Sequence, residues 1–532
     1  MSEQTEQTAK LEPTEHVLNT YTKKERNMYL TGLAGQNVIY NIINVAFANF
    51  AQFTIAIPAM VVSAILTVAR IWDAFNDPMM GTIVDKTRSR WGKCRPYLIF
   101  VPLPIMLITI SCFVSFGPYE GTQTWADLSN PHNLLVVLWA AFTYILWGMT
   151  YTVGDIPLWG VTALMTESAE DRNKLLSLAR MIAGVGGGAA LLTIIPVINA
   201  VSITMTERMG GDPNLGERMG YLVTASIYAF VGCALYQLTG PSIKERIPPS
   251  PRSYTLGKNF SLMWTNKPFR QVLLSGILGS PKMLIMNAAM PLIQYYFASK
   301  DATKAFLYLL LLGGGMFVGQ FVAMGFVPRL TAKYEKKDLY NYSNLISVLP
   351  FLAIFASYQW APDHNVTTAP FLAFSFVLFA ICGGANGIGS VLQSIMIADA
   401  VDYEEYHNGV RTDGAFFSGQ TFLAKLTSAI ATILSGIAFS YVGFSDAKVL
   451  ELNDFVAAGG IPRLEPKYQS YMMILFFIVS IPPAIGSILA VLPTWKYAQS
   501  DAMHDKILAE LNERRHKLAV GDDTTVEETS EA

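Results

Sequence analysis

Long apolar segments separated by short polar loops make up most of this chain. Runs of about 20 apolar residues, such as 305–327 and 471–492, are each long enough to cross the hydrocarbon core of a bilayer as a helix. The pattern predicts twelve membrane-spanning helices, at roughly 29–56, 59–84, 97–116, 133–160, 178–201, 221–240, 268–298, 305–328, 341–360, 370–399, 413–442 and 471–494. The expected fold class is therefore an all-α membrane protein.

The polar segments divide the predicted helices into two groups of six. This division predicts an N-terminal segment 1–28, a first six-helix bundle 29–240, a Pro-rich basic connector 241–267, a second six-helix bundle 268–495 and a tail 496–532. Lys and Arg gather after the second and eighth spans, so the positive-inside rule puts these loops and both termini in the cytoplasm. The first 28 residues contain no apolar signal-peptide core. Within the tail, 500–520 predicts a short amphipathic helix.

The composition supports a membrane location and excludes several classes of protein. Hydrophobic residues make up 52% of the chain and charged residues 15%, against about 25% charged residues in soluble domains. The cysteines Cys94, Cys112, Cys233 and Cys382 are scattered, which suits neither a disulfide framework nor a metal site. No HExxH, GxSxG or paired-histidine motif occurs, so we expect no enzyme activity, no resident cofactor and no nucleic-acid partner.

The predicted second span carries polar side chains in its interior, in the stretch RIWDAFNDPMMGTIVD. Asp73, Asn76 and Asp77 have the spacing i, i+3, i+4, which puts them on one helix face. An ionised carboxylate at bilayer depth costs about 3 kcal/mol, so it needs a cation, a proton or water. The group suits a hard cation such as Na⁺, and the two carboxylates could equally hold a proton. The alternative is that Asp73 pairs with Arg70 and Asp77 meets the cytoplasmic interface.

A second polar group lies in the predicted fourth span, in YTVGDIPLW. Thr152 and Asp155 are three residues apart, and Trp159 follows one turn later. Thr152 could complete the oxygen shell of a cation, while a carboxylate beside an indole ring suits the hydroxyls and the apolar face of a sugar. Pro157 removes a backbone donor and can leave a carbonyl such as that of Gly154 facing a cavity. Without these partners, Trp159 would be core packing.

A third group runs from Ile397 to Ala429. An acidic, tyrosine-bearing cytoplasmic loop is expected to lead into the eleventh span, which carries Gln420 and Lys425. A lysine about halfway along a span needs an anion, and the aspartates of the second and fourth spans are the candidates. The alternative is that Lys425 extends to the membrane surface.

Together these stretches resemble the glycoside-pentoside-hexuronide:cation symporter family of the major facilitator superfamily. The resemblance covers essentially the whole chain and rests on RIWDAFNDP with SRWGKCRP, YTVGDIPLW, and IADAVDYEEYHNGVR to LAKLTSA. It implies a major facilitator fold and Na⁺- or H⁺-coupled symport of a sugar or glycoside by alternating access. The expected location is the plasma membrane, in a bacterium the inner membrane, and we expect a functional monomer.

The resemblance also implies roles for individual residues. The family's cation site falls on Asp73, Asn76, Asp77 and Thr152, and its sugar contacts fall on Asp155, Trp159, Arg180, Gln420 and Lys425. The chain departs from the family where a sugar-binding aspartate corresponds to Asn37 and a tryptophan near the substrate corresponds to Ser390. The substrate specificity of other family members is therefore not transferred.

Lys282, in SGILGSPKMLIMN, is a further departure because it lies near mid-membrane in the seventh span. A carboxylate lost at Asn37 and an ammonium gained at Lys282 would make the cavity more positive. This suggests an anionic substrate such as a uronide, with Lys282 as a substrate contact. The alternative is that Lys282 neutralises another buried acid or faces water at a helix break beside Pro281.

Other functions are weighed against sugar symport. A cation-coupled carrier of lysolipids or other amphiphiles is the alternative, and it predicts an apolar lateral entry path rather than a polar cavity. A channel does not fit a plan of two matching halves. In alternating access, the loop cations that follow Asp85 are expected to latch the cytoplasmic side against acids such as Asp402, Glu404 and Glu405.

Overall fold

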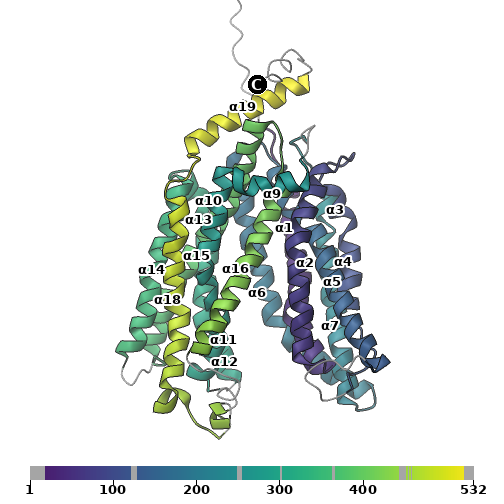
Figure 1. Ribbon diagram of the computed structural model, residues 1–532, viewed down its shortest axis with the longest axis vertical. Coiled ribbons are helices and arrows are strands. Elements are labelled where there is room, and N and C mark those ends of the chain that lie inside the picture. The colour runs from purple at the N-terminus through teal and green to yellow at the C-terminus, as the bar shows by residue number, and fades with distance from the viewer. Residues whose placement is uncertain are drawn as a thin grey trace, which may run out of the picture.

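The structure is a computed structural model that describes residues 18–120, 129–248, 254–299, 302–361, 366–441 and 451–520, apart from 453 and 457 (Figure 1). Every element in these ranges is a helix, so the all-α prediction is confirmed for this part of the chain. The N-terminal residues 1–17, the middle of the predicted connector and the acidic end 521–532 lie outside the described residues.

The helices fall into two series along the chain. Up to residue 248 they are α1 (Lys23–Asn49), η1 (Phe50–Thr54), α2 (Ala59–Lys86), α3 (Arg95–Phe100), α4 (Pro102–Ser111), α5 (Pro131–Gly160), η2 (Val161–Ala163), α6 (Ala169–Arg208), α7 (Pro213–Tyr236) and α8 (Thr239–Ser242). From residue 254 they are α9 (Leu256–Thr265), α10 (Lys267–Leu278), η3 (Ser280–Met283), α11 (Leu284–Pro291), η4 (Leu292–Phe297), α12 (Ala302–Tyr308), η5 (Leu309–Gly313), α13 (Gly314–Thr331), α14 (Lys336–Trp360), α15 (Ala369–Asn408), α16 (Asp413–Tyr441), η7 (Pro462–Leu464), η8 (Pro466–Tyr468), α18 (Gln469–Thr494) and α19 (Asp501–Val520).

Side-chain caps explain where several of these helices begin. At the start of α1 the Thr22 hydroxyl accepts the Glu25 N–H, and the Glu25 carboxylate accepts the Thr22 N–H in return. At the start of α10 the Asn266 side chain accepts the Phe269 N–H. These contacts satisfy backbone donors that have no partner within the helix.

Seven helical segments of the described chain are long and apolar enough to cross a membrane: 131–163, 169–208, 213–242, 309–331, 336–360, 369–408 and 466–494. Some of the other predicted spans are charged or interrupted. The second span, α2, carries several charged side chains, and the seventh is broken into α10, η3, α11 and η4 around Pro281 and Pro291, which lack a backbone donor. The count of twelve spans stays a prediction.

The two series of helices form two groups that lie side by side in Figure 1. In the first series α1 packs on α6 and α7, and in the second α13 packs on α15 and α14 on α18. The groups meet where α2 packs against α16 and α6 against α13. They lie close together at the end that carries α19 and separate toward the opposite end (Figure 1).

Two glycines bring the groups together at the crossing of α2 and α16. A Cβ atom added to Gly81 would meet the backbone carbonyl of Gly414, and one added to Gly414 would meet the carbonyl of Gly81. The two helix backbones are therefore in contact at this point, which only residues without a side chain permit.

Helix α15 extends further than the sequence predicts. The expected loop after residue 399 is instead helical as far as Asn408, where Gly409 ends the helix with a φ of +65°. The prediction of a loop was wrong: a run of acidic residues is typical of a solvent-exposed loop, but this one is helical. Asp399 and Asp402 are in fact buried against cations of other helices, which removes the reason for the chain to leave the helix there.

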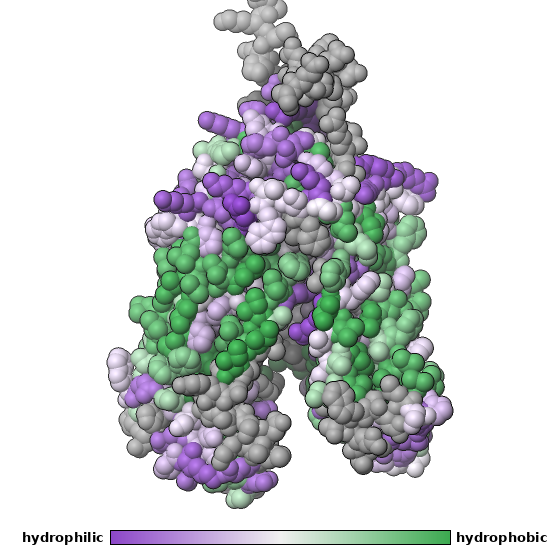
Figure 2. Space-filling view, in the orientation of Figure 1, coloured by the Kyte–Doolittle hydropathy of each residue, from purple (hydrophilic) through white to green (hydrophobic). Residues whose placement is uncertain are grey.

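The surface has the polarity of a membrane protein. Figure 2 shows a hydrophobic belt around the middle of the molecule and hydrophilic side chains toward both ends. It also shows a notch between the two groups, open at the end opposite α19, with hydrophilic atoms at its deep end. The molecule is thus closed on the α19 side and open on the other side.

Candidate functional site

A lysine and two aspartates form the centre of the polar group inside the helices. The Lys425 Nζ of α16 lies 3.1 Å from an Asp73 carboxylate oxygen and 2.8 Å from one of Asp77, both on α2. The Thr152 hydroxyl of α5 donates to Asp77 at 3.0 Å. Three helices therefore converge on Asp77, whose exposed fraction is only 1%. Asp73 pairs with Lys425 and makes no ion pair with Arg70 in the described structure.

Asn76 shares the helix face of the two aspartates but does not join their contacts. Its side chain is buried, and its amide nitrogen has no hydrogen-bond partner among the described residues. Rotating the amide by 180° exchanges its nitrogen and oxygen, so the same position can offer an acceptor. Two carboxylates, a hydroxyl and this amide make a set of oxygen ligands that fits a hard monovalent cation.

One turn further along α5, Asp155 is held by a residue that sequence reasoning missed. The Gln36 amide of α1 donates to the Asp155 carboxylate at 2.8 Å and also to the Tyr151 hydroxyl. The Tyr151 ring stacks on Trp147 with ring centres 5.0 Å apart. Gln36 stands beside Asn37 in the middle of α1, and a polar amide at that depth was the signal that could have identified it.

A further turn along α5, Trp159 meets a cation. The Arg180 guanidinium of α6 lies over the Trp159 ring, 4.2 Å from its centre, and donates to the Ser394 hydroxyl of α15 at 2.8 Å. Gln420 of α16 donates to the same hydroxyl at 3.4 Å, and its amide oxygen has no partner among the described residues. Arg180 makes no ion pair with a carboxylate in the described chain.

These contacts arrange the predicted residues along two helices. Thr152, Asp155 and Trp159 follow one face of α5, and Gln420 and Lys425 lie on α16, which packs against both α2 and α5. The candidate cation group and the candidate sugar group are therefore neighbours along the same pair of helices.

Two of the predicted positions differ from expectation in their surroundings. The carbonyl of Gly154 does not face a cavity, because it accepts a hydrogen bond from the Tyr236 hydroxyl at 3.0 Å. The Asn37 amide donates to the carbonyl of Leu33 at 2.9 Å and to the Gln36 amide oxygen at 3.2 Å. Asn37 is thus linked to Asp155 only indirectly, by its hydrogen bond to Gln36, which in turn donates to Asp155.

The structure does not bring Lys282 together with the other candidate residues. Its ammonium donates to the Asn344 side chain of α14 at 2.7 Å, and it makes no ion pair with any described acid. In Figure 1, α14 lies at the outer edge of the second group of helices, away from the region where the two groups face each other. Lys282 is therefore turned toward the interior of its own group.

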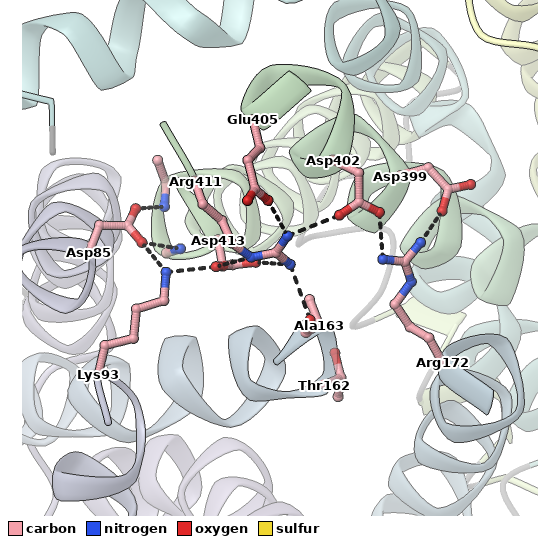
Figure 3. A network of polar contacts seen from close by, with 12 residues as sticks. Asp85, Lys93, Thr162, Ala163, Arg172, Asp399, Asp402, Glu405, Arg411 and Asp413 are labelled. Atoms are coloured by element: carbon pink, nitrogen blue, oxygen red, sulfur yellow. Dashed lines mark hydrogen bonds and ion pairs between the residues drawn. The ribbon is translucent and has the colours of Figure 1, made fainter. Parts of the chain in front are cut away.

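At the α19 end, a chain of buried ions joins the two groups (Figure 3). The Asp85 carboxylate, at the end of α2, accepts the N–H groups of Gly414 and Ala415 at 2.9 Å each, at the start of α16. The Lys93 ammonium lies 3.0 Å from Asp85 and 2.6 Å from Asp413. Burial alone would lower the pKa of Lys93, but Asp413 and Asp85 raise it above its usual value.

Arg411 occupies the centre of this chain of ions. Its side chain is fully buried and lies 2.8 Å from Asp413, 3.0 Å from Asp402 and 2.7 Å from Glu405. It also donates to the carbonyl of Ala163, in the first group of helices, at 3.1 Å. A guanidinium with a donor for each partner can satisfy all four contacts at once. We call the ion pairs among the following residues the ionic lock: Asp85, Lys93, Arg172, Asp399, Asp402, Glu405, Arg411 and Asp413.

The acids and cations of the ionic lock pair differently from what the sequence predicts. The loop cation Lys93 binds Asp85 and Asp413, whereas Asp402 is bound by Arg172 of α6 at 2.7 Å and by Arg411. Glu404 accepts hydrogen bonds from the Asn266 and Asn408 amides and makes no ion pair with a loop cation among the described residues. The expected pairing of the loop after Asp85 with Asp402, Glu404 and Glu405 was therefore wrong in its partners. The cause is the extended α15, which turns Asp402 toward α6.

Known proteins match this chain over most of its length. The sequence profile described as "MFS/sugar transport protein" matches residues 28–499. The inner membrane symporter YicJ of Escherichia coli (strain K12) is 27% identical over 426 residues, covering 80% of this chain and 84% of YicJ. The glucuronide carrier protein homolog of the same strain is 23% identical over 479 residues, covering 89% of this chain and 93% of that protein.

The fold also matches solved structures. A crystal structure of FucP, an MFS transporter of E. coli, in the outward conformation, aligns with a TM-score of 0.58. It is 12% identical in sequence and covers 89% of this chain and 98% of FucP. At this identity the likeness concerns the fold.

Proposed function

This chain belongs to the family of MFS/sugar transport proteins, and on that premise we propose that it is a cation-coupled symporter of a sugar or glycoside. It has the major facilitator fold that its sequence predicts, and it is a multi-pass membrane transporter rather than an enzyme. The observation that carries the proposal is the ion-paired group of Asp73, Asp77 and Lys425, which is joined through the Thr152 hydroxyl to α5, the helix that also carries Asp155 and Trp159.

Coupling follows from the chemistry of these neighbouring groups. A cation, Na⁺ or H⁺, binds at Asp73 and Asp77 with help from Asn76 and Thr152, and competes there with the ammonium of Lys425. The loaded cation group then orders the sugar group along α5 and α16. Because coupling free energies are reciprocal, the cation tightens sugar binding by the same factor by which sugar tightens cation binding.

We propose for this chain the membrane arrangement that its sequence predicts. We place the α19 side in the cytoplasm, because the basic loops after α2 and α13 lie there. The closed lock on that side and the open notch on the other then correspond to an outward-facing carrier. The proposal includes two six-helix bundles, 29–240 and 268–495, both termini in the cytoplasm of a bacterial cell and a monomeric carrier in the inner membrane.

A uronide is the second candidate substrate within this proposal. Arg180 is a cation in the candidate sugar group without a carboxylate partner in the described chain, and a guanidinium binds a carboxylate in two-point contact. The similarity to a glucuronide carrier protein homolog is in line with it. A lysolipid carrier is not favoured, because hydrophilic atoms line the deep end of the notch (Figure 2).

The proposed function is tested by uptake into proteoliposomes. Neutral glycosides and uronides are offered under an imposed Na⁺ gradient, an imposed pH gradient or neither. We expect one of the two gradients to drive accumulation above the external concentration, and the panel to identify the substrate class. Uptake of every substrate at the same rate with and without gradients would contradict coupling.

Replacing Arg180 separates the two substrate classes. For Arg180→Gln we expect the KM of a uronide to rise by about tenfold or more, since a hydrogen bond to a charged group contributes about 1.5–3 kcal/mol. The KM of the matched neutral glycoside should change much less. Lys282→Gln is the control, because Lys282 is turned toward Asn344 and should affect both substrates equally. The opposite assignment, with Lys282→Gln selective for the uronide, would show that Lys282 is the anion-binding residue.

A further inference from the structure

Helix α19 lies across the closed end of the molecule (Figure 1). His504, Ile507 and Leu511 form its inner face, with exposed fractions of 1%, 3% and 3%. Their spacing of three and four residues places them on one stripe, while Lys506 and Glu510 are exposed. The helix therefore docks through an apolar stripe that contains one buried histidine.

His504 touches the ionic lock directly. Its Nε2 lies 3.1 Å from an Asp402 oxygen and 3.4 Å from an Asp399 oxygen, both on α15. The same acids bind Arg172 of α6 at 2.7 Å each, and Asp399 also binds Lys336 of α14 at 2.5 Å. His504 thus contacts the two acids that tie α15 to the other group of helices.

Arg515, near the end of α19, makes a second contact with the lock. It donates to the two Glu405 carboxylate oxygens at 2.5 and 3.2 Å, and one of these oxygens also lies 2.7 Å from Arg411. The Arg515 side chain is only 9% exposed. Glu405 is therefore held between the cation at the centre of the lock and the cation of α19.

Coverage by α19 changes the strength of the pairs beneath it. Water around an ion pair weakens the attraction by raising the effective dielectric constant, and an exposed pair contributes at most about 1 kcal/mol. His504 excludes water from Asp399 and Asp402, and Arg515 fixes the rotamer in which Glu405 reaches Arg411. Both effects act on contacts between the two groups, because Arg172 belongs to α6 of the first group and Asp399 and Asp402 belong to α15 of the second.

We propose that α19 is a strap that biases the carrier toward the state closed on the α19 side, with His504 and Arg515 as positioning residues that hold the acids of α15 in register for Arg172 and Arg411. The proposal rests on the proposed function as a carrier that alternates between two states. It assigns to the segment after the last predicted span a role in the conformational equilibrium.

The test measures the distance between the two groups on the α19 side in the full chain. Spin labels at Arg90→Cys and Lys333→Cys, both exposed, report it by double electron–electron resonance without substrate or gradient. The four native cysteines are buried, so they compete little for the label. For His504→Ala and for Arg515→Ala we expect the population at the longer distance to rise about threefold or more.

Two further variants and a measurement of thermal stability complete the test. Lys506→Ala, on the exposed face of α19, should leave the distances unchanged, and Arg515→Lys should restore part of the shorter-distance population because it keeps the charge beside Glu405. Lower thermal stability with unchanged distances in both alanine variants would mean that α19 only supports the fold, and would overturn the proposal. So would a shift toward the shorter distance. The distance measurement uses neither sugar nor a cation gradient. Its outcome is therefore independent of whether the uptake assay shows sugar symport.

Discussion

Asp77→Asn is expected to abolish cation-driven accumulation of the sugar and to leave only slow equilibration down its gradient. Asp77 is nearly fully buried and is the point where Lys425 and Thr152 converge. Asparagine removes the charge of this carboxylate, and a contact to a charged group contributes about 1.5–3 kcal/mol. Each 1.4 kcal/mol is about a factor of ten, so we expect cation affinity to fall by about tenfold or more. Proteoliposome uptake with and without the driving gradient measures the loss.

The matched control for this change is Asp505→Asn, which removes an aspartate that is exposed on α19. It should keep wild-type accumulation. Counterflow exchange of labelled for unlabelled sugar then shows whether the Asp77→Asn protein still moves substrate. Full gradient-driven accumulation by Asp77→Asn would mean that the carboxylates of α2 are structural and that coupling arises elsewhere.

Arg411→Gln is expected to open the closed side of the carrier. The guanidinium is fully buried and joins three acids and the carbonyl of Ala163, so its removal leaves buried negative charge without its cation. At about 3–5 kcal/mol for a broken buried pair, the equilibrium between the closed and open states should shift by about 100-fold or more.

A cysteine reporter measures this opening. The Ser177 hydroxyl of α6 donates to the Met324 carbonyl of α13 at 2.5 Å, in the contact between the two groups, and Ser177 is 2% exposed. A maleimide should label Ser177→Cys slowly in the otherwise unchanged chain and much faster when Arg411→Gln is added. Arg90→Gln, which removes an exposed arginine of the same side, serves as the control. Equal labelling rates in all three proteins would contradict a role of Arg411 in closing this side.

The fold was predictable because its signals are local. Each long apolar run had to be helical to satisfy its backbone in a bilayer, which fixed the helical class without knowledge of packing. The length of α15 was not predictable in this way. The same acidic residues that suggest a solvated loop are stable in a helix once Arg172 and Arg411 pair with them, and Arg172 comes from α6, 227 residues away from Asp399 in the chain.

In the candidate site, charge was a better guide than polarity. A lysine about halfway along a span favours an acidic partner, so the aspartates of the second and fourth spans were candidates for Lys425, which pairs with Asp73 and Asp77. Gln36 carries no charge and so gave no such requirement, although it holds Asp155. The direction of Lys282 could not be extrapolated, because the 3₁₀ turn η3 changes the helical phase between α10 and α11.

The pairing of Lys425 with two aspartates also has an electrical consequence. In their charged forms Asp73, Asp77 and Lys425 sum to −1, so one bound monovalent cation brings the group to zero. A membrane potential does work of about 2.3 kcal/mol per elementary charge per 100 mV. A voltage that is negative inside therefore does no work on this group in the loaded carrier. The same voltage drives the negatively charged group of the unloaded carrier outward. The membrane potential therefore acts on the step in which the empty carrier returns to the outward-facing state.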